Sequence, residues 1–183
     1  AALFTAVLSI AVSAARGQSP QAAFLAAVAN DRVQEVRRLL ASGTDPDTVD
    51  GNGEPALMIA VRAGNVATVE LLLATRANVN ARNAFGDSAL MVASLGGHLD
   101  LVRKLRARGA DVNQKGWNAL IYAATGGHDD VVRYLLAEGA EIDAASANGT
   151  TALMMGAREG HASTLDLLIA RGADVKHRNE NGA

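Results

Sequence analysis

The sequence predicts an all-α fold built as a solenoid of stacked helix-turn-helix repeats, and three patterns in register lead to this prediction. A glycine followed three residues later by Ala-Leu recurs at Gly53, Gly86, Gly116 and Gly149, at intervals of 33, 30 and 33 residues. Further glycines keep the same register at Gly64, Gly97, Gly127 and Gly160. Aliphatic triplets spaced at +3 and +4 recur as Val69/Leu72/Leu73, Val132/Leu135/Leu136 and Leu165/Leu168/Ile169. Three patterns in phase indicate internal repeats.

Each repeat is predicted to contain two short helices joined by a glycine. Leu57, Ala60 and Val61 form one apolar stripe at helical spacing, and the aliphatic triplet forms the stripe of the second helix. The glycine between them is expected to end the first helix in a left-handed conformation. Gly43, Gly109, Gly139 and Gly172 are expected to close the second helices. An extended segment follows, whose lone β-branched residue is predicted to point inward.

The composition excludes several classes of protein. The chain has 183 residues, 49% hydrophobic and 20% charged, which suffices for one domain with a core and is too apolar for a disordered chain. The net charge of −2 gives no basic excess for nucleic acid. The cysteine count of zero excludes disulfides, zinc-thiolate sites and cysteine nucleophiles.

Two segments carry the strongest family resemblance, GHLDLVRKLRARGADVN (Gly97–Asn113) and GHDDVVRYLLAEGAEID (Gly127–Asp143). They resemble the ankyrin repeat, of the kind found in exported bacterial ankyrin proteins. The resemblance covers a domain of residues 21–183 and implies a β-turn finger and two helices per repeat, acting as a non-enzymatic protein-binding module without a cofactor. The repeats are 21–52, 53–85, 86–115, 116–148 and 149–181, the first resembling an N-terminal cap.

Some positions depart from the family pattern. Its Thr-Pro-Leu-His motif begins here with Pro55, Ser88, Asn118 or Thr151. The last three can cap the first helix through a side-chain oxygen, and Pro55 cannot. Met or Ile replaces the histidine of that motif, so hydrophobic packing is expected in place of hydrogen bonding.

Three further departures are local. Arg76 stands where other repeats have glycine, so we expect a left-handed arginine whose replacement by glycine stabilises the stack by about 1 kcal/mol. Arg106 replaces the second leucine of its pair, and its charged end is expected to reach water. Only three positions separate Asn113 from Gly116, which predicts a shortened finger.

The first fifteen residues, 1–15, carry no charge and match the apolar part of a secretory signal, with 16–20 as a linker. Either Ser13 and Ala15 or Val12 and Ala14 fit a signal-peptidase site. The alternative is an apolar helix packed on the fold. If residues 1–15 are a secretory signal, the protein is predicted to be exported, to the bacterial periplasm or as a secreted protein, with no membrane span in the mature chain.

The last helix pair lacks a polar cap in the sequence. Leu165, Leu168 and Ile169 are therefore expected to be partly bare. This leaves two alternatives open. The chain is the ankyrin portion of a larger exported protein whose catalytic or other functional domain lies beyond Ala183, or a partner docks on this edge.

The motifs of catalysis and metal binding are absent from the sequence. Asp45, Asp47 and Asp50 resemble a calcium loop, but the spacing fails and favours a polar turn. Asp129-Asp130 lies at a helix start, where carboxylates favour the dipole. The repeated histidines, at His98, His128 and His161, are too far apart across stacked helices to share a metal. The resemblance implies that each begins a second helix and bonds to backbone.

The resemblance places the binding surface on the finger tips and the exposed side of the first helices. The binding candidates there are Arg62, Arg82, Phe85, Asp87, Leu95, Lys115, Trp117, Arg158 and Glu159, and Asn52, Glu54, Thr125, Asn148 and Thr150 share this surface. Phe85 and Trp117 are the strongest candidates because aromatic residues often anchor interfaces. The alternative is that they only cover the shortened finger. Tyr122 and Tyr134 are assigned to packing. The expected partner is a protein, and not nucleic acid or a metal.

Overall fold

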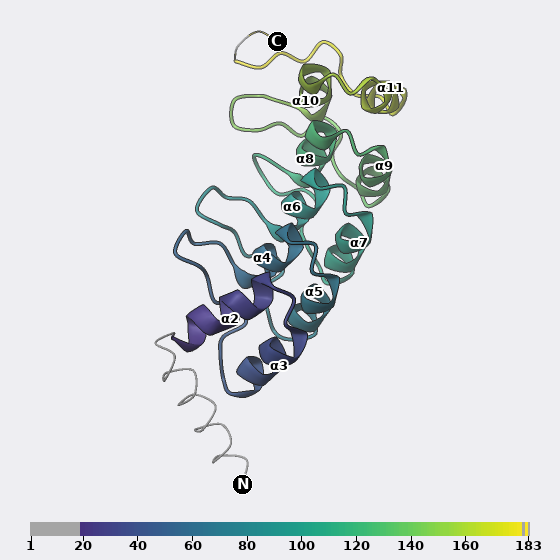
Figure 1. Cartoon of the computed structure of the whole chain (residues 1–183). Helices are drawn as coiled ribbons and strands as arrows, with labels where there is room; N and C mark the ends of the chain where they lie inside the picture. The colour runs from purple at the N-terminus through teal and green to yellow at the C-terminus, as the bar shows by residue number, and fades with distance from the viewer. Residues whose placement is uncertain (1–18, 181, 183) are drawn as a thin grey trace. The chain divides into compact units, whose positions relative to one another are not determined.

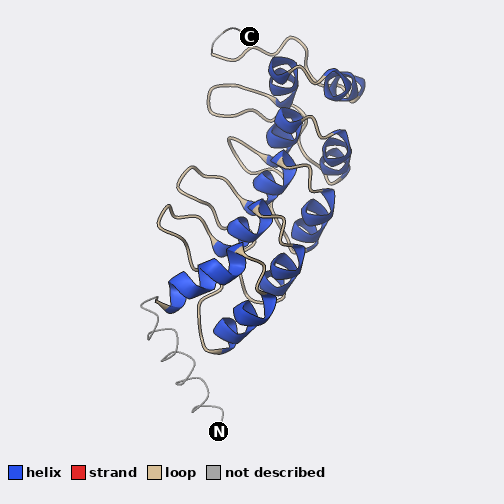
Figure 2. Cartoon of the chain, viewed as in Figure 1, coloured by secondary structure: helices blue, strands red, loops and turns tan. Residues whose placement is uncertain are grey.

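The structure, a computed structural model, describes residues 19–180 and 182, and contains ten helices and no strand there (Figures 1 and 2). The helices come in consecutive pairs: α2 (Pro20–Ala29) with α3 (Val33–Ala41), α4 (Ala56–Arg62) with α5 (Val66–Leu73), α6 (Ala89–Leu95) with α7 (Leu99–Ala107), α8 (Ala119–Gly126) with α9 (Asp129–Ala137), and α10 (Ala152–Glu159) with α11 (Ala162–Ala170). One pair lies in each predicted repeat, which confirms the all-α repeat fold. The signal-like segment 1–15 and the start of the linker lie outside the described residues.

The chain divides into two compact units, one ending at Gly86 and the other beginning at Asp87. In the first unit α4 packs beside α2, and α5 beside α3. In the second unit α8 lies between α6 and α10, while α9 lies between α7 and α11 (Figure 1). Within each unit the first helices therefore form one layer and the second helices another, with the fingers projecting from the first layer.

The predicted apolar stripes form the core of each unit. Leu57, Leu90 and Leu120 are buried on the first helices, and Val69 and Val102 on the second. Burying an aliphatic side chain of this size stabilises the fold by about 1.5–3 kcal/mol. Because each stripe is covered mainly by the neighbouring helix pair, stability in such a stack depends on repeat-to-repeat contact.

The glycines that end the first helices have the predicted left-handed backbone, with φ between +67° and +79° at Gly64, Gly97, Gly127 and Gly160. The glycines after the second helices also have positive φ.

The prediction for Arg76 is wrong. Asp31 is the one non-glycine residue with positive φ in the described part of the chain. Thr75 explains why Arg76 avoids strain: its hydroxyl donates to the carbonyl of Leu72 at 2.5 Å and accepts from the amide of Ala77 at 3.2 Å. The threonine side chain thus turns the chain after α5, and a left-handed residue is not needed there.

The expected caps are present at two first helices. Asn118 accepts from the amide of Ile121 at 3.0 Å, and Thr151 from that of Met154 at 3.4 Å. Pro55 provides no side-chain cap, as predicted. Met91 does more than pack, because its sulfur accepts from the amide of Ser88 at 3.3 Å. The methionine therefore keeps a weak polar role in place of the histidine.

Arg106 differs from expectation. Its Nη1 donates to the carbonyl of Ala110 and its Nη2 lies 3.2 Å from the carboxylate of Glu138, so both terminal nitrogens bond within the protein. Its Nε is buried without a hydrogen-bond partner. The edge of the last pair is partly bare, as predicted, because Ile169 is half exposed while Leu168 is fully buried.

The backbone at Arg76 reverses the sign of the expected mutational effect. We predict that Arg76→Gly lowers the free energy of unfolding by about 0.5 kcal/mol, because glycine adds freedom to the unfolded chain and relieves no strain. Urea denaturation of the two proteins measures the difference. A gain of about 1 kcal/mol would show instead that residue 76 is left-handed.

Candidate protein-binding surface

Two of the repeated histidines, His128 and His161, join successive repeats. His128 Nε2 lies 2.9 Å from the carbonyl oxygen of Leu95, and His161 Nε2 lies 3.0 Å from that of Thr125. Both histidines immediately precede a second helix, as the resemblance implied. In the first unit Asn65 takes this role, donating from Nδ2 to the carbonyl of Val28 at 2.9 Å. These bonds give all three residues a structural role at the contact between repeats.

The same histidines pack against glycines of the preceding repeat. A methyl group on Gly97 would lie 2.4 Å from Nδ1 of His128, and one on Gly127 would lie 2.5 Å from Nδ1 of His161. Gly160, with a similar φ of +79°, has nothing within 4 Å of the same point. Gly97 and Gly127 therefore satisfy two constraints, the left-handed backbone and a close approach to the imidazole ring.

Gly160 provides a matched control for this close approach. We predict that Gly160→Ala costs about 1 kcal/mol of stability, which is the cost of a left-handed alanine alone. Gly127→Ala should cost about 1–3 kcal/mol more, because the added methyl overpacks the site against the His161 ring. Urea unfolding of both variants measures the difference.

Adding His161→Ala to Gly127→Ala should recover part of that excess, since the two residues are in contact. Equal losses for Gly127→Ala and Gly160→Ala would contradict the packing role of the histidine.

Side-chain and backbone hydrogen bonds order the finger tips. Asp50 accepts from the amides of Asn52 and Glu54 at 2.9 and 2.8 Å. The hydrogen bond from the Glu54 amide is the main reason why the pKa of Asp50 lies below its usual value. In the second finger Asn83 Oδ1 accepts from the amide of Phe85 at 2.9 Å, and the amide of Gly86 donates to the carbonyl of Asn83 at 3.0 Å. Each finger is a short turn with a defined backbone.

Phe85 is the most exposed large apolar residue that the structure describes, at 86%. It occupies the third position of the turn from Asn83 to Gly86, and Gly86 closes the turn with a φ of +86°. Phe85 therefore lies in the turn of the second finger. Because the ring is so exposed, packing within the first unit does not explain why this position is a phenylalanine.

The other two candidates of the first unit differ from each other. Arg82 is exposed on the second finger. Arg62, at the end of α4, is held by Glu54, whose Oε1 accepts from its Nη2 at 2.6 Å and its Nε at 2.9 Å. Glu54 is the more buried of the pair, so the ion pair fixes the guanidinium beside the base of the first finger.

In the second unit the structure brings together Asp87, Trp117 and Tyr122. Tyr122, from α8, donates its hydroxyl to Oδ1 of Asp87 at 2.6 Å. Trp117 meets the Tyr122 ring edge to face, with centroids 5.7 Å apart and an interplanar angle of 73°. Trp117 itself remains 41% exposed. The three side chains form one cluster, which combines an exposed aromatic face with a carboxylate.

The remaining candidates of the second unit are separate from this cluster. Lys115 is exposed on the shortened finger, and Leu95 is exposed at the end of α6. Arg158 and Glu159 lie side by side at the end of α10, with Nε and Oε1 3.5 Å apart. Both are exposed, so their pairing contributes little to stability.

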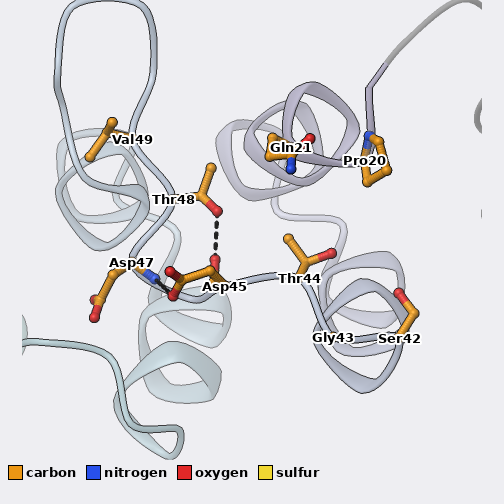
Figure 3. A pocket seen from close by; sticks show the side chains of 9 residues that line it. All are labelled: Pro20, Gln21, Ser42, Gly43, Thr44, Asp45, Asp47, Thr48 and Val49. Atoms are coloured by element: carbon orange, nitrogen blue, oxygen red, sulfur yellow. Dashed lines mark hydrogen bonds between the residues drawn. The ribbon is translucent and has the colours of Figure 1, made fainter.

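A pocket of about 640 Å³ lies between the start of α2 and the loop that follows α3 (Figure 3). Asp45 and Asp47 line it, and the carboxylates of both accept backbone amides. Asp45 Oδ1 accepts from the amide of Asp47 at 2.9 Å, and Asp47 Oδ1 accepts from that of Asn78 at 2.7 Å. The first bond agrees with the predicted polar turn, and the second joins this loop to the following repeat.

Asp129 and Asp130 are also used structurally. Asp129 accepts from the hydroxyl of Thr164, which is fully buried, at 2.6 Å. Asp130 accepts from the amide of Val131 at 2.8 Å. Within residues 19–180 no three His, Cys, Asp or Glu side chains are grouped so that they could hold a metal ion. No helix among the described residues is long and apolar enough to cross a membrane.

Comparison with known proteins bears directly on the repeats. The family model for ankyrin repeats (3 copies) matches residues 24–115 and 109–179. The chain belongs to the ankyrin repeat family. A comparison with curated proteins finds no match. Ankyrin repeats are generally protein–protein interaction modules and are typically non-enzymatic.

Sequence reasoning missed two residues of this surface. Tyr122, assigned to packing, is half-buried and links Trp117 to Asp87. Glu54, placed on the surface but not among the binding candidates, holds Arg62. An alignment of the repeats contains the signal for Tyr122, because Ile59, Val92 and Met155 are aliphatic or thioether side chains at its position.

Proposed function

We propose that the chain binds a protein partner through its fingers and the adjoining side of the first helices, with Phe85 as an anchor in the first unit. The observation that supports this most is the 86% exposure of Phe85 on an ordered turn. Large aromatic side chains are enriched among the residues that dominate binding energy at interfaces. Because the turn is already ordered, it also loses little conformational entropy on binding.

The other fingers indicate that the turn does not require a phenylalanine. The residue equivalent to Phe85 is Asn52 in the first finger and Asn148 in the finger before α10. Turns of this kind accept most residues at that position, while Asn, Asp or Ser at the first position and Gly at the fourth set the backbone. The aromatic ring therefore supports binding and not folding.

A single substitution tests this function. We predict that Phe85→Asn leaves the urea unfolding midpoint unchanged, because asparagine already occupies the equivalent position in two fingers. Retention of a partner protein should fall at least about tenfold, equal to 1.4 kcal/mol, because a buried aromatic anchor is lost. The measurement is capture from the native cell on the full-length chain, quantified by mass spectrometry.

Val175→Asn is the matched control, since Val175 is also exposed and apolar but follows α11 and does not lie at a finger tip. Proteins retained by the wild type and by Val175→Asn, and lost with Phe85→Asn, are finger-dependent partners. Equal retention by all three proteins would contradict the proposed function.

We also propose that the protein is exported. The support is the uncharged apolar segment 1–15 followed by small residues. Residues 1–20 behind an added Met-Lys-Lys, fused to a reporter enzyme that needs disulfides for activity, should give an active reporter in a bacterial host, because disulfides form outside the cytoplasm. Leu8→Arg with Ile10→Arg should abolish the activity, since charges interrupt the apolar segment. Equal reporter activity with and without the two arginines would contradict export.

A further inference from the structure

The cluster of Asp87, Trp117 and Tyr122 has a chemical preference of its own. We infer that it binds an arginine side chain of a protein partner, an inference that rests on the proposed protein-binding function and adds the chemistry of the contact. The cluster combines two aromatic rings with a carboxylate, and Glu54 with Arg62 provides a comparison within the same chain.

The two aromatic rings, of Trp117 and Tyr122, are in contact with each other, and Trp117 remains accessible to solvent. Trp117 lies at the end of the shortened finger, 41% exposed, and its edge-to-face contact with Tyr122 restricts the orientation of both rings. A guanidinium within about 6 Å of such a ring is attracted by its π face. The chain itself provides an example, because Cζ of Arg103 lies 5.5 Å from the ring centroid of Tyr134.

The acidic part is the carboxylate of Asp87. It accepts the hydroxyl hydrogen of Tyr122 at 2.6 Å, which orients the carboxylate beside the aromatic pair. An ionised carboxylate has two oxygens and can accept from several donors at once. A guanidinium can therefore donate to the carboxylate and lie against a ring at the same time, which suits a planar group with several N–H donors.

The first unit shows what the position of Asp87 accepts. Glu54 follows Gly53 as Asp87 follows Gly86, and Glu54 binds the guanidinium of Arg62, eight residues further on. The residue eight positions after Asp87 is Leu95, whose exposed side chain has no hydrogen-bond donor. The carboxylate at this position therefore binds an arginine in the first unit, and we expect Asp87 to bind an arginine of the partner.

The shortened finger explains why the ring pair is accessible. Residues 108–118 connect α7 to α8, and in Figure 1 this loop extends less far than the loop that precedes α10. Gln114 is buried at its base, with Nε2 3.6 Å from the sulfur of Met91. The finger thus folds inward at Gln114, and Trp117 is left exposed at its end.

Trp117 is the only tryptophan in the chain, so its fluorescence reports on this cluster alone. The probe is the blocked peptide Gly-Gly-Arg-Gly-Gly, compared with the same peptide carrying citrulline, a neutral side chain of nearly the same shape. On the full-length chain we expect a saturable change in emission with the arginine peptide, and at least tenfold weaker binding of the citrulline peptide.

Asp87→Asn should weaken the arginine peptide at least tenfold, while Asp166→Asn, with the same change in net charge on an exposed residue of α11, should not. Tyr122→Phe keeps the ring, removes the hydroxyl that orients Asp87 and should give an intermediate loss. Equal binding of the two peptides, no binding of either, or equal effects of Asp87→Asn and Asp166→Asn would overturn the inference.

The experiment also separates this inference from the proposed function. Capture that depends on Phe85, together with no preference for arginine, leaves the proposed function intact and overturns the inference. A clear preference for arginine, together with capture that is indifferent to both Phe85 and Asp87, supports an arginine site and contradicts the proposed function.

Discussion

The close approach of one repeat to the next, glycine against histidine, is the constraint on which the second unit depends. Gly97 and Gly127 have no Cβ, and the imidazole rings of His128 and His161 occupy the space that a Cβ would fill. From there the rings reach carbonyl oxygens at the end of the preceding first helix. One contact thus satisfies helix-terminal carbonyls that would otherwise lack partners and sets the separation between neighbouring repeats.

A second series of hydrogen bonds keeps the bases of the fingers in register. Asp47, Asn113 and Asp143 each accept a backbone amide from the following repeat, at 2.7 to 2.9 Å. These bonds lie at the finger bases, while the tips are ordered by their own turns. The finger tips can therefore vary in sequence without changing how the repeats stack. Phe85 at one tip and Asn148 at another show this independence.

The sequence predicted the repeats well because their signals are local and periodic. Helix pairs, left-handed glycines and the caps at Asn118 and Thr151 follow from spacing and side-chain type. Arg76 was mispredicted because its neighbour Thr75 turns the chain with a hydroxyl, an alternative that a comparison of glycine positions does not contain. Arg106 was mispredicted for a related reason, since its partners Ala110 and Glu138 are identified only by tertiary packing.

The residues of the proposed binding surface differ from repeat to repeat, whereas those of the scaffold recur. At scaffold positions the repeats agree with one another, as at the left-handed glycines and at the histidines that bond to the preceding repeat. The repeats disagree at Phe85, Trp117 and Tyr122, and there the structure shows either an exposed ring or a contact that stacking does not require. Because a solenoid needs the same contacts in every repeat, residues that appear once are released from that requirement. Differences between repeats are therefore where partner specificity is expected in this chain, and the cluster around Asp87 combines two such differences, Trp117 and Tyr122, with an acidic side chain that Glu54 also supplies in the first unit.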